Sequence, residues 1–304
     1  MAQDYEIIIV GGGPAGLTAG IYAARARRRT LLLEKHGTGG QMALTWEVEN
    51  YPGVEKISGY DLGQVMERQA RSFGLEIRSV EVAGIESAGG AHRVRTSEGD
   101  LSCRALVIAS GARSNRLGVP GEAELTGRGV SYCATCDGAF YQGVPVAVVG
   151  GGDTALEEAL FLTRYASRVF LVHRRSEFRG TELLQERIAA EPKIEPVLDS
   201  VVERIEGAQG VTGLGLKNLK SGAASVLAVE GAFIFVGTTP NTEYLRGFLP
   251  LDKQGFVETT PNLETALPGV FAAGDCRAKV LRQISTAVGE GALAATMADH
   301  HLSH

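Results

Sequence analysis

The feature that most constrains the fold is an internal repeat in which an apolar run ends at three glycines. Ile7–Val10 leads into Gly11-Gly12-Gly13-Pro14-Ala15-Gly16, and 139 positions further on Val146–Val149 leads into Gly150-Gly151-Gly152-Asp153-Thr154-Ala155. In each copy a helical pattern follows, over residues 15–26 and 154–165, and then a second strand-like run, over residues 30–33 and 169–172. The repeat predicts two β-α-β units in an α/β fold.

The glycines suit a turn that binds a dinucleotide. The first glycine of each copy (Gly11, Gly150) makes the tight turn, and the second (Gly13, Gly152) lets the backbone approach a pyrophosphate. The third position (Gly16, alanine in the second copy) lets helix and strand pack closely, while the helix N-terminus attracts phosphate. One glycine-rich string alone is weak evidence for a dinucleotide site, and the alternative interpretation is that the two strings form turns with a purely structural role. Two copies in the same context favour two Rossmann-like dinucleotide-binding domains.

The end of the second strand distinguishes the two predicted sites. Glu34 lies 23 residues after Gly11, where an acid hydrogen-bonds a ribose 2′-hydroxyl. The matching residue of the second copy is His173, which is followed by Arg174, Arg175 and Arg179. Guanidinium groups bind a 2′-phosphate that a carboxylate would repel. The first site is therefore expected to take an unphosphorylated adenosine and the second a phosphorylated one; the alternative for the second is a solvated basic loop.

Charge and composition exclude several other classes of protein. The net charge is −5 and the pI is near 5.8, which argues against a nucleic-acid-binding surface. No apolar run reaches the roughly 18 residues that a membrane helix needs. The chain begins with a strand-like run and without a visible secretory signal, so a cytoplasmic location is expected.

Cys133-Ala134-Thr135-Cys136-Asp137 lies just before the second repeat. A zinc site would need a second pair of ligands, and a structural disulfide is disfavoured in a reducing cytosol, so a redox dithiol is the main interpretation. Asp137 is the nearest acid–base group; its alternative role is that of a turn residue before Gly138. Since a nicotinamide delivers hydride, which a disulfide does not readily accept, FAD is the expected intermediary.

On these residues the chain resembles the low-molecular-weight bacterial thioredoxin reductases. The resemblance covers almost the whole chain and includes the following strings: Gly11 to Gly16, Gly39 to Met42, Glu47 to Gly53, Cys133 to Gly138, Gly150 to Ala155, His173 to Arg175 with Arg179, Gly274-Asp275 and Arg282-Gln283. Cys-Ala-Thr-Cys-Asp-Gly between two dinucleotide fingerprints is the most specific of them.

The resemblance implies a discontinuous FAD-binding domain, residues 1–114 and 244–304, with an inserted NADPH-binding domain, residues 115–243, that carries the cysteine pair. It implies a homodimer, thioredoxin as the partner, and electron flow from NADPH through FAD and Cys133/Cys136 to thioredoxin. Cys136 would face the flavin, Cys133 would attack the partner's disulfide, and Asp137 would shuttle the proton. Rotation of the inserted domain about its two crossings would exchange the dithiol and the nicotinamide at the flavin.

The resemblance also assigns further residues to the cofactors. A strand over residues 269–275 would place Asp275 near the ribityl and pyrophosphate groups, and Arg282 and Gln283 would approach the isoalloxazine. The remaining assigned positions are Gly40, Gln41, Asn50, Gly111 and Gly274 for FAD, and Asp153 and Thr154 for NADPH. Cys276 departs from the family pattern; it is either an inert buried thiol or a site of oxidation near the flavin.

Two alternatives stay open. In the first alternative, the chain is the same kind of dithiol flavoprotein, but it reduces a disulfide protein other than thioredoxin or uses an electron donor other than NADPH. In the other, the chain is a flavin-containing redox sensor or electron-transfer subunit that binds a partner without turnover. The presence of both cysteines, the acid and both nucleotide turns favours turnover.

Overall fold

The computed structural model describes residues 5–45 and 48–304. Glu47, which belongs to one of the strings quoted for the family resemblance, lies outside them. The chain divides into two compact units, one made of Met1–Arg113 with Thr239–His304 and the other of Ser114–Thr238. Each unit is built on a parallel sheet flanked by helices. The predicted α/β class with two Rossmann-like domains is therefore confirmed.

The parallel sheet of the first unit has the strand order β18-β7-β1-β2-β3. Its central strand β1 (Ile7–Val10) is buried throughout, and its side chains alternate between two apolar cores on the two faces of the sheet. The predicted strands are confirmed here. The other strands are β2 (Thr30–Glu34), β3 (Glu76–Ser79), β7 (Ala105–Ile108) and β18 (Val270–Ala272).

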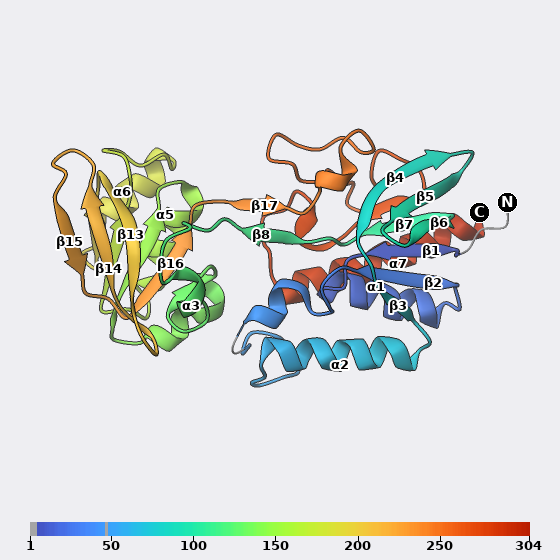
Figure 1. The fold of residues 1–304 in the computed structure, drawn as a ribbon, viewed down its shortest axis with the longest axis horizontal. Helices are drawn as coiled ribbons and strands as arrows, with labels where there is room; N and C mark the ends of the chain where they lie inside the picture. Colours follow the sequence, from blue (N-terminus) through green and yellow to red (C-terminus); the bar gives the residue numbers. More distant parts are fainter. Residues whose placement is uncertain (1–4, 46–47) are drawn as a thin grey trace. The chain divides into compact units, whose positions relative to one another are not determined.

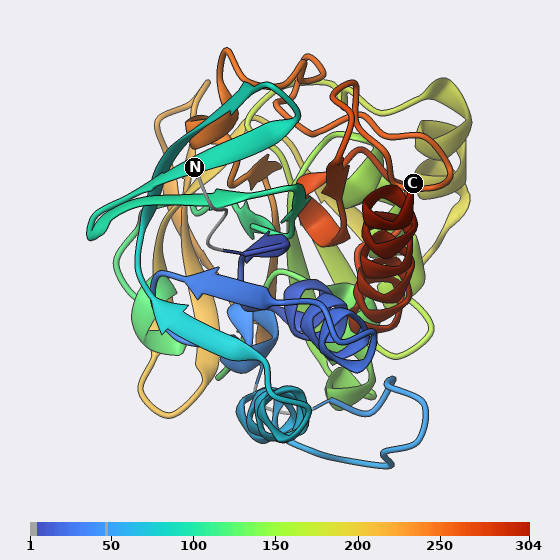
Figure 2. The same cartoon turned by 90° about the vertical axis from the view of Figure 1, so that its right-hand side faces the viewer.

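Helices cover one face of this sheet. Helix α1 (Pro14–Arg25) lies beside α7 (Ile284–Ser303), and α2 (Gly59–Ser72) packs next to α1 (Figure 1; Figure 2). The helices α1 and α7 approach so closely that a Cβ at Gly291 would lie 2.1 Å from the Ala15 carbonyl oxygen. The described part of this unit also contains short 3₁₀ helices, namely η1 (Gly40–Leu44), η3 (Glu243–Leu245) and η4 (Gly274–Cys276).

An antiparallel three-stranded sheet supplies the other core of the first unit. Its strands are β4 (Val82–Ala88), β5 (Ala91–Thr96) and β6 (Gly99–Cys103), paired in that order. Ile85 and Val94 from this sheet share a buried cluster with Ile8 and Leu106 of the parallel sheet. The dinucleotide turn after β1 is thus held by a strand that is packed on both faces.

The second unit repeats this plan. Its parallel sheet has the order β12-β11-β10-β16-β9, made of β9 (Val130–Ser131), β10 (Pro145–Gly150), β11 (Arg168–Val172), β12 (Ile194–Val197) and β16 (Gly231–Phe235). The helical segments are α3 (Glu122–Leu125), α4 (Ala134–Asp137), η2 (Gly138–Tyr141), α5 (Asp153–Leu162) and α6 (Glu182–Ala190). An antiparallel sheet of β13 (Ser200–Gly207), β14 (Val211–Asn218) and β15 (Ala224–Leu227) contributes to a core shared with β10.

The chain passes between the units along β8 (Ala112–Ser114) and β17 (Thr238–Pro240), which pair as a two-stranded sheet. The second unit ends five residues before the boundary suggested at residue 243. Residues 239–243 group with the first unit because they bond to it. The Asn241 N–H donates to the Gly111 carbonyl at 3.0 Å, and Thr242 Oγ1 donates to the Gly255 carbonyl at 2.7 Å.

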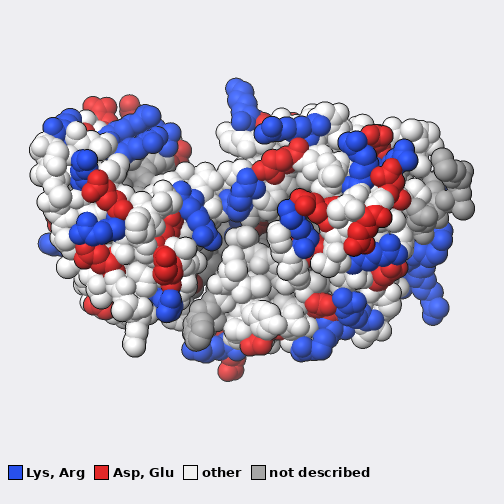
Figure 3. Space-filling model, viewed as in Figure 1, with Lys and Arg blue, Asp and Glu red and all other residues white. Residues whose placement is uncertain are grey.

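Acidic and basic side chains are interspersed on the face drawn in Figure 3. Within the described ranges, no helix is both long enough and apolar enough to cross a membrane.

Candidate functional site

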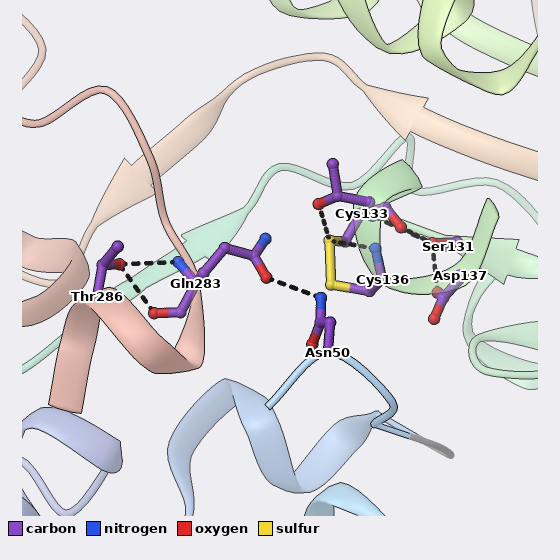
Figure 4. The surroundings of a disulfide bond; sticks show 8 residues. Asn50, Ser131, Cys133, Cys136, Asp137, Gln283 and Thr286 are labelled. Carbon is purple, nitrogen blue, oxygen red and sulfur yellow. Dashed lines mark hydrogen bonds between the residues drawn. A yellow bond between two sulfur atoms is a disulfide. The ribbon is translucent and has the colours of Figure 1, made fainter. Parts of the chain in front are cut away.

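The two cysteines of the Cys-Ala-Thr-Cys string form a disulfide in the second unit. Cys133 is the N-cap of α4, and its Cα lies 5.3 Å from that of Cys136. The Cys136 N–H donates a hydrogen bond of 3.2 Å to the Cys133 sulfur, and Thr135 Oγ1 lies 3.4 Å from the same sulfur (Figure 4). Both cysteines are partly exposed. A disulfide in this position is accessible to thiol–disulfide exchange.

Asp137 ends the same short helix, and its carboxyl is half-buried. Ser131 Oγ donates a hydrogen bond of 2.5 Å to Asp137 Oδ2 (Figure 4). Burial raises the pKa of Asp137, and the Ser131 hydrogen bond offsets part of that rise. A carboxyl whose pKa is raised exchanges its proton nearer to neutral pH than an ordinary aspartate does. The predicted acid–base group therefore lies in the same turn as the disulfide.

The other two cysteines are buried in the first unit. Burial raises the pKa of Cys103 to about 12 and that of Cys276 to about 11. Such thiols carry almost no thiolate at neutral pH, which favours the inert interpretation of Cys276. In the part of the chain that the structure describes, no cluster of three or more His, Cys, Asp or Glu side chains is arranged to hold a metal ion.

The first glycine-rich turn joins β1 to α1. Gly11 has φ +110°, and a Cβ there would lie 2.3 Å from the Ala109 carbonyl oxygen; a Cβ at Gly16 would lie 1.8 Å from the Gly11 carbonyl oxygen. A Cβ at Gly13 would meet only the Cα of Gly40, at 4.0 Å, so the space beside this backbone is open. Gly13 caps α1 without a side-chain hydrogen bond, and Pro14 and Ala15 begin the helix. The turn therefore presents an open helix N-terminus, as a phosphate site requires.

Glu34 closes β2 next to this turn. One of its carboxylate oxygens accepts a hydrogen bond of 2.6 Å from the Gly12 N–H, and the other accepts one of 3.0 Å from the His36 N–H. Each oxygen keeps a second lone pair for a hydroxyl donor. The structure thus brings the predicted acid to the glycine-rich turn.

Asp275 belongs to a partly buried cluster of charges at η4. Lys279 Nζ lies 3.1 Å from Asp275 Oδ1 and 3.4 Å from Glu290 Oε2, and Glu290 also accepts the Gly274 N–H at 2.7 Å. Asp275 Oδ1 forms this ion pair with Lys279 and accepts no hydrogen bond from the described residues. A carboxylate oxygen that accepts no hydrogen bond fits a ligand that donates a hydroxyl hydrogen.

The other residues assigned to the first site lie on loops and helix ends of the same unit. The Arg282 guanidinium stacks 4.3 Å above the Phe256 ring, and Gln283 caps α7. Asn50 Nδ2 donates a hydrogen bond of 3.2 Å to Gln283 Oε1 (Figure 4). Gly40 and the exposed Gln41 begin η1, and Gly111, with φ +68°, has open space in place of a Cβ.

The second glycine-rich turn joins β10 to α5. A Cβ at Gly150 would lie 2.5 Å from the Phe235 carbonyl oxygen, whereas one at Gly152 would meet nothing within 4 Å. Gly152 caps α5 without a side-chain hydrogen bond, and the helix begins with Asp153 and Thr154. Asp153 Oδ1 accepts the Thr181 N–H at 2.7 Å, which ties the helix start to the basic loop after β11.

His173 and the arginines that follow it surround this turn. The His173 ring is buried against Gly151, and its Nε2 lacks a hydrogen-bond partner in the described part of the chain. Burial, and then the charges of Arg179, Arg175 and Arg174, lower the pKa of His173. The Arg179 N–H donates to the Gly151 carbonyl at 2.6 Å. The three arginines are exposed, and no ion pair to an acidic side chain engages them within the described ranges.

Three polar contacts of these sites were not predicted from the sequence. They are made by Ser131, Lys279 and Glu290. Each of these residues either lies far in sequence from the residue that it contacts or belongs to no recognisable motif with it. Ser131 lies six residues before Asp137, and a turn separates the two residues. Neither helical nor strand periodicity therefore predicts that their side chains meet. Glu290 reaches Gly274 only because α7 folds back beside the turn.

Known proteins share this architecture. Residues 5–291 match the family described as pyridine nucleotide-disulphide oxidoreductase. The thioredoxin reductase of Listeria monocytogenes is 44% identical over 299 residues, which cover 98% of this chain and 94% of that protein. The solved thioredoxin reductase of Streptococcus pyogenes is 42% identical, covers 98% of both chains and gives a TM-score of 0.95. That of Lactococcus lactis, described as the FR conformation, is 42% identical over 99% of both chains and gives a TM-score of 0.69.

The family match and the relatives each extend over almost the whole chain, across both glycine-rich turns and the cysteine pair between them. The chain therefore belongs to the pyridine nucleotide-disulphide oxidoreductase family and, within it, to the thioredoxin reductases.

Proposed function

We propose that this oxidoreductase is an NADPH-dependent thioredoxin-disulfide reductase that uses FAD. The observation that carries the proposal is the Cys133–Cys136 disulfide with the half-buried Asp137 in the same turn. An accessible disulfide with an acid–base group beside it suits dithiol–disulfide exchange with a protein substrate. Oxidised thioredoxin is the proposed substrate, as the names of the relatives suggest.

FAD is proposed to bind the first unit. The open space at Gly13 suits a pyrophosphate at the start of α1, and Glu34 has lone pairs for the adenosine ribose. Asp275 Oδ1, which accepts no hydrogen bond from the described residues, suits a ribityl hydroxyl. We assign the remaining contacts to Gly11, Pro14, Ala15, Gly16, Gly40, Gln41, Asn50, Gly111, Gly274, Arg282 and Gln283.

NADPH is proposed to bind the second unit at the turn formed by Gly150, Gly152, Asp153 and Thr154. The exposed Arg174, Arg175 and Arg179 are not engaged by acidic side chains in the described residues and are available for a 2′-phosphate. His173 Nε2, buried without a partner, is available for a further polar contact. The contrast between this basic loop and Glu34 supports one phosphorylated and one unphosphorylated adenosine.

When bound, FAD would supply the step between hydride from NADPH and electrons for a disulfide. The chain's own residues then handle thiols and protons. Reduction of the Cys133–Cys136 bond leaves a thiol pair in which Cys133 attacks the disulfide of thioredoxin and Cys136 resolves the mixed disulfide. Asp137 holds the proton that a departing thiolate needs and regains it from solvent.

Three further parts of the proposal concern the whole protein. We propose that the inserted unit turns about the crossings at β8 and β17. Two solved relatives with the same 42% identity give TM-scores of 0.95 and 0.69, as expected if members of the family are solved in more than one conformation. A homodimer and a cytoplasmic location are proposed from the family resemblance.

Substitution of one sulfur tests the role of the pair. Cys136→Ser is expected to keep NADPH oxidation by an acceptor that takes electrons directly from a flavin, while reduction of oxidised thioredoxin falls to background. Cys103→Ala, which removes a buried thiol outside the pair, serves as the control and should keep both activities. Thioredoxin reduction by Cys136→Ser at the wild-type rate would refute the assigned chemistry.

A further inference from the structure

Ser131 lies at the centre of the polar contacts around the disulfide. It ends β9, is only 4% exposed, and is held by the pairing of β9 with β16, in which Ser131 lies opposite Phe233. Its hydroxyl oxygen is 2.5 Å from Asp137 Oδ2 and 3.2 Å from the Cys133 carbonyl oxygen, and it accepts the Cys133 N–H at 3.1 Å (Figure 4). One buried hydroxyl thus contacts both the acid and the backbone of the first cysteine.

A serine hydroxyl donates one hydrogen bond and accepts two, and this count fits both protonation states of Asp137. When Asp137 is ionised, Ser131 donates to its carboxylate and accepts the Cys133 N–H. When Asp137 is protonated, its O–H donates to Ser131 Oγ, and the Ser131 proton turns to the Cys133 carbonyl. In each state every polar group of Ser131 has a partner that the structure already places within reach.

The other titratable groups near Asp137 do not offer such a contact. Tyr141 on η2 lies close enough that burial and the Asp137 charge together raise the pKa of Tyr141 to about 12. Helix α5 packs against α4 and carries the acidic residues Glu157 and Glu158, neither of which shifts the pKa of Asp137. Burial raises the pKa of Asp137, and among the described residues Ser131 is the one whose hydrogen bond lowers it.

We propose that Ser131 is a positioning residue that holds the Asp137 carboxyl beside the cysteine pair in both of its protonation states. The inference rests on the proposed role of Asp137 in dithiol chemistry. Reduction breaks the Cys133–Cys136 bond and adds two electrons and two protons. A hydride equivalent supplies both electrons and one proton, and Asp137 supplies the second proton to the departing thiolate and regains it from solvent. Ser131 keeps the carboxyl in place while that proton comes and goes.

The test measures the thiol–disulfide equilibrium of the holoprotein against pH, in dithiothreitol buffers, with the cysteine state read by alkylation and mass. Reduction replaces the disulfide near Asp137 with two thiols, so the pKa of Asp137 should differ between the oxidised and the reduced protein. The midpoint should then inflect where Asp137 titrates, and Asp137→Asn should lose that inflection. Ser131 forms a stronger, charge-assisted hydrogen bond with the ionised carboxylate than with the protonated acid, so Ser131→Ala should move the inflection to higher pH by about one unit, a roughly tenfold change in proton affinity. This measurement needs neither NADPH nor thioredoxin, so it stands even if the proposed substrate is wrong.

Two variants keep the test decisive. Tyr132→Phe also deletes a hydroxyl, from the residue that precedes Cys133 in the sequence. That hydroxyl donates to Glu122 at 2.9 Å, so the inflection should stay at the wild-type pH. Ser131→Thr keeps a hydroxyl and should restore the wild-type inflection even if Ser131→Ala is too unstable to measure. An unmoved inflection in Ser131→Ala, an equal shift in Tyr132→Phe, a shifted Ser131→Thr, or no Asp137-dependent inflection would each overturn the proposal.

Discussion

At the residue scale, Glu158 on α5 is an acid with a buried carboxylate oxygen. Its Oε2 is buried without a hydrogen-bond partner in the described part of the chain. Burial, and then the charge of Glu157, raise the pKa of Glu158 to about 7. The folded state therefore binds a proton that the unfolded state releases at lower pH. The stability from this proton is fully present below about pH 4.5, the ordinary value for Glu, and is lost as pH rises through 7.

Replacement by the neutral isostere tests this linkage. Glu158→Gln is expected to raise the free energy of unfolding by about 1–2 kcal/mol at pH 8, allowing for partial solvation, and to change it little at pH 4.5. The exposed neighbour Glu157→Gln should change stability by less than about 0.5 kcal/mol at either pH. Denaturant unfolding at the two pH values measures both variants. A gain for Glu158→Gln that does not depend on pH would contradict this account.

The arginines after β11 test the nucleotide assignment. Replacing Arg174 and Arg175 with Ala is expected to raise the KM for NADPH by about 10- to 150-fold per lost charge-assisted contact, at roughly 1.5–3 kcal/mol each. The KM for NADH, which has no 2′-phosphate, should change far less. Arg187→Ala removes the same charge from the exposed face of α6 and should leave both constants unchanged. An unaltered preference for NADPH in the double variant would show that the second site has been misread.

Site residues could be predicted from the sequence where a residue of suitable chemistry stands at a fixed spacing from a glycine-rich turn. Glu34 and His173 occupy equivalent places after their turns, and the structure puts both beside the glycines. The sequence did not predict Ser131, because a serine at the end of a short strand has no pattern that distinguishes it from a packed one. The contact with Asp137 depends on the turn at Cys133, which only the folded backbone defines.

At the element scale, the packing of α1 against α7 depends on small residues. Gly291→Ala would place a Cβ 2.1 Å from the Ala15 carbonyl oxygen and should destabilise the protein by about 1–3 kcal/mol through overpacking. Gly289 lies in the same helix with nothing within 4 Å of its Cβ position. Gly289→Ala should therefore stabilise by up to about 1 kcal/mol through helix propensity. Equal effects of the two variants in thermal unfolding would rule out this packing argument.

The β-α-β elements were predictable because their signals are local. Buried runs of four or five apolar residues followed by glycines define strands such as β1 and β10, and the structure confirms them. The antiparallel sheets β4–β6 and β13–β15 were not predicted. The strands of these sheets mix exposed and buried residues without a clear alternation. Their formation depends on pairing with the neighbouring strand across a turn, which sequence periodicity does not reveal.

At the scale of the whole molecule, the first unit is assembled from two stretches separated by the second unit. The repeat indicated two domains, and a strand predicted near residue 270 returns the chain to the first sheet as β18. The predicted boundary at residue 243 lies five residues beyond the end of the second compact unit, because the turn-rich string after Gly237 gives no sign of which unit its residues bond to. A dimer interface has no comparable sequence pattern, so the homodimer stays a prediction.

The central claim is that NADPH electrons leave this protein through Cys133 and Cys136 to thioredoxin. The most direct measurement follows NADPH oxidation by a catalytic trace of purified protein, with and without oxidised thioredoxin. The account predicts sustained oxidation only when thioredoxin is present. If NADPH bleaches the flavin but thioredoxin adds nothing, the proposed partner is wrong. If NADPH leaves the flavin unchanged, the assignment of the arginine loop is wrong as well.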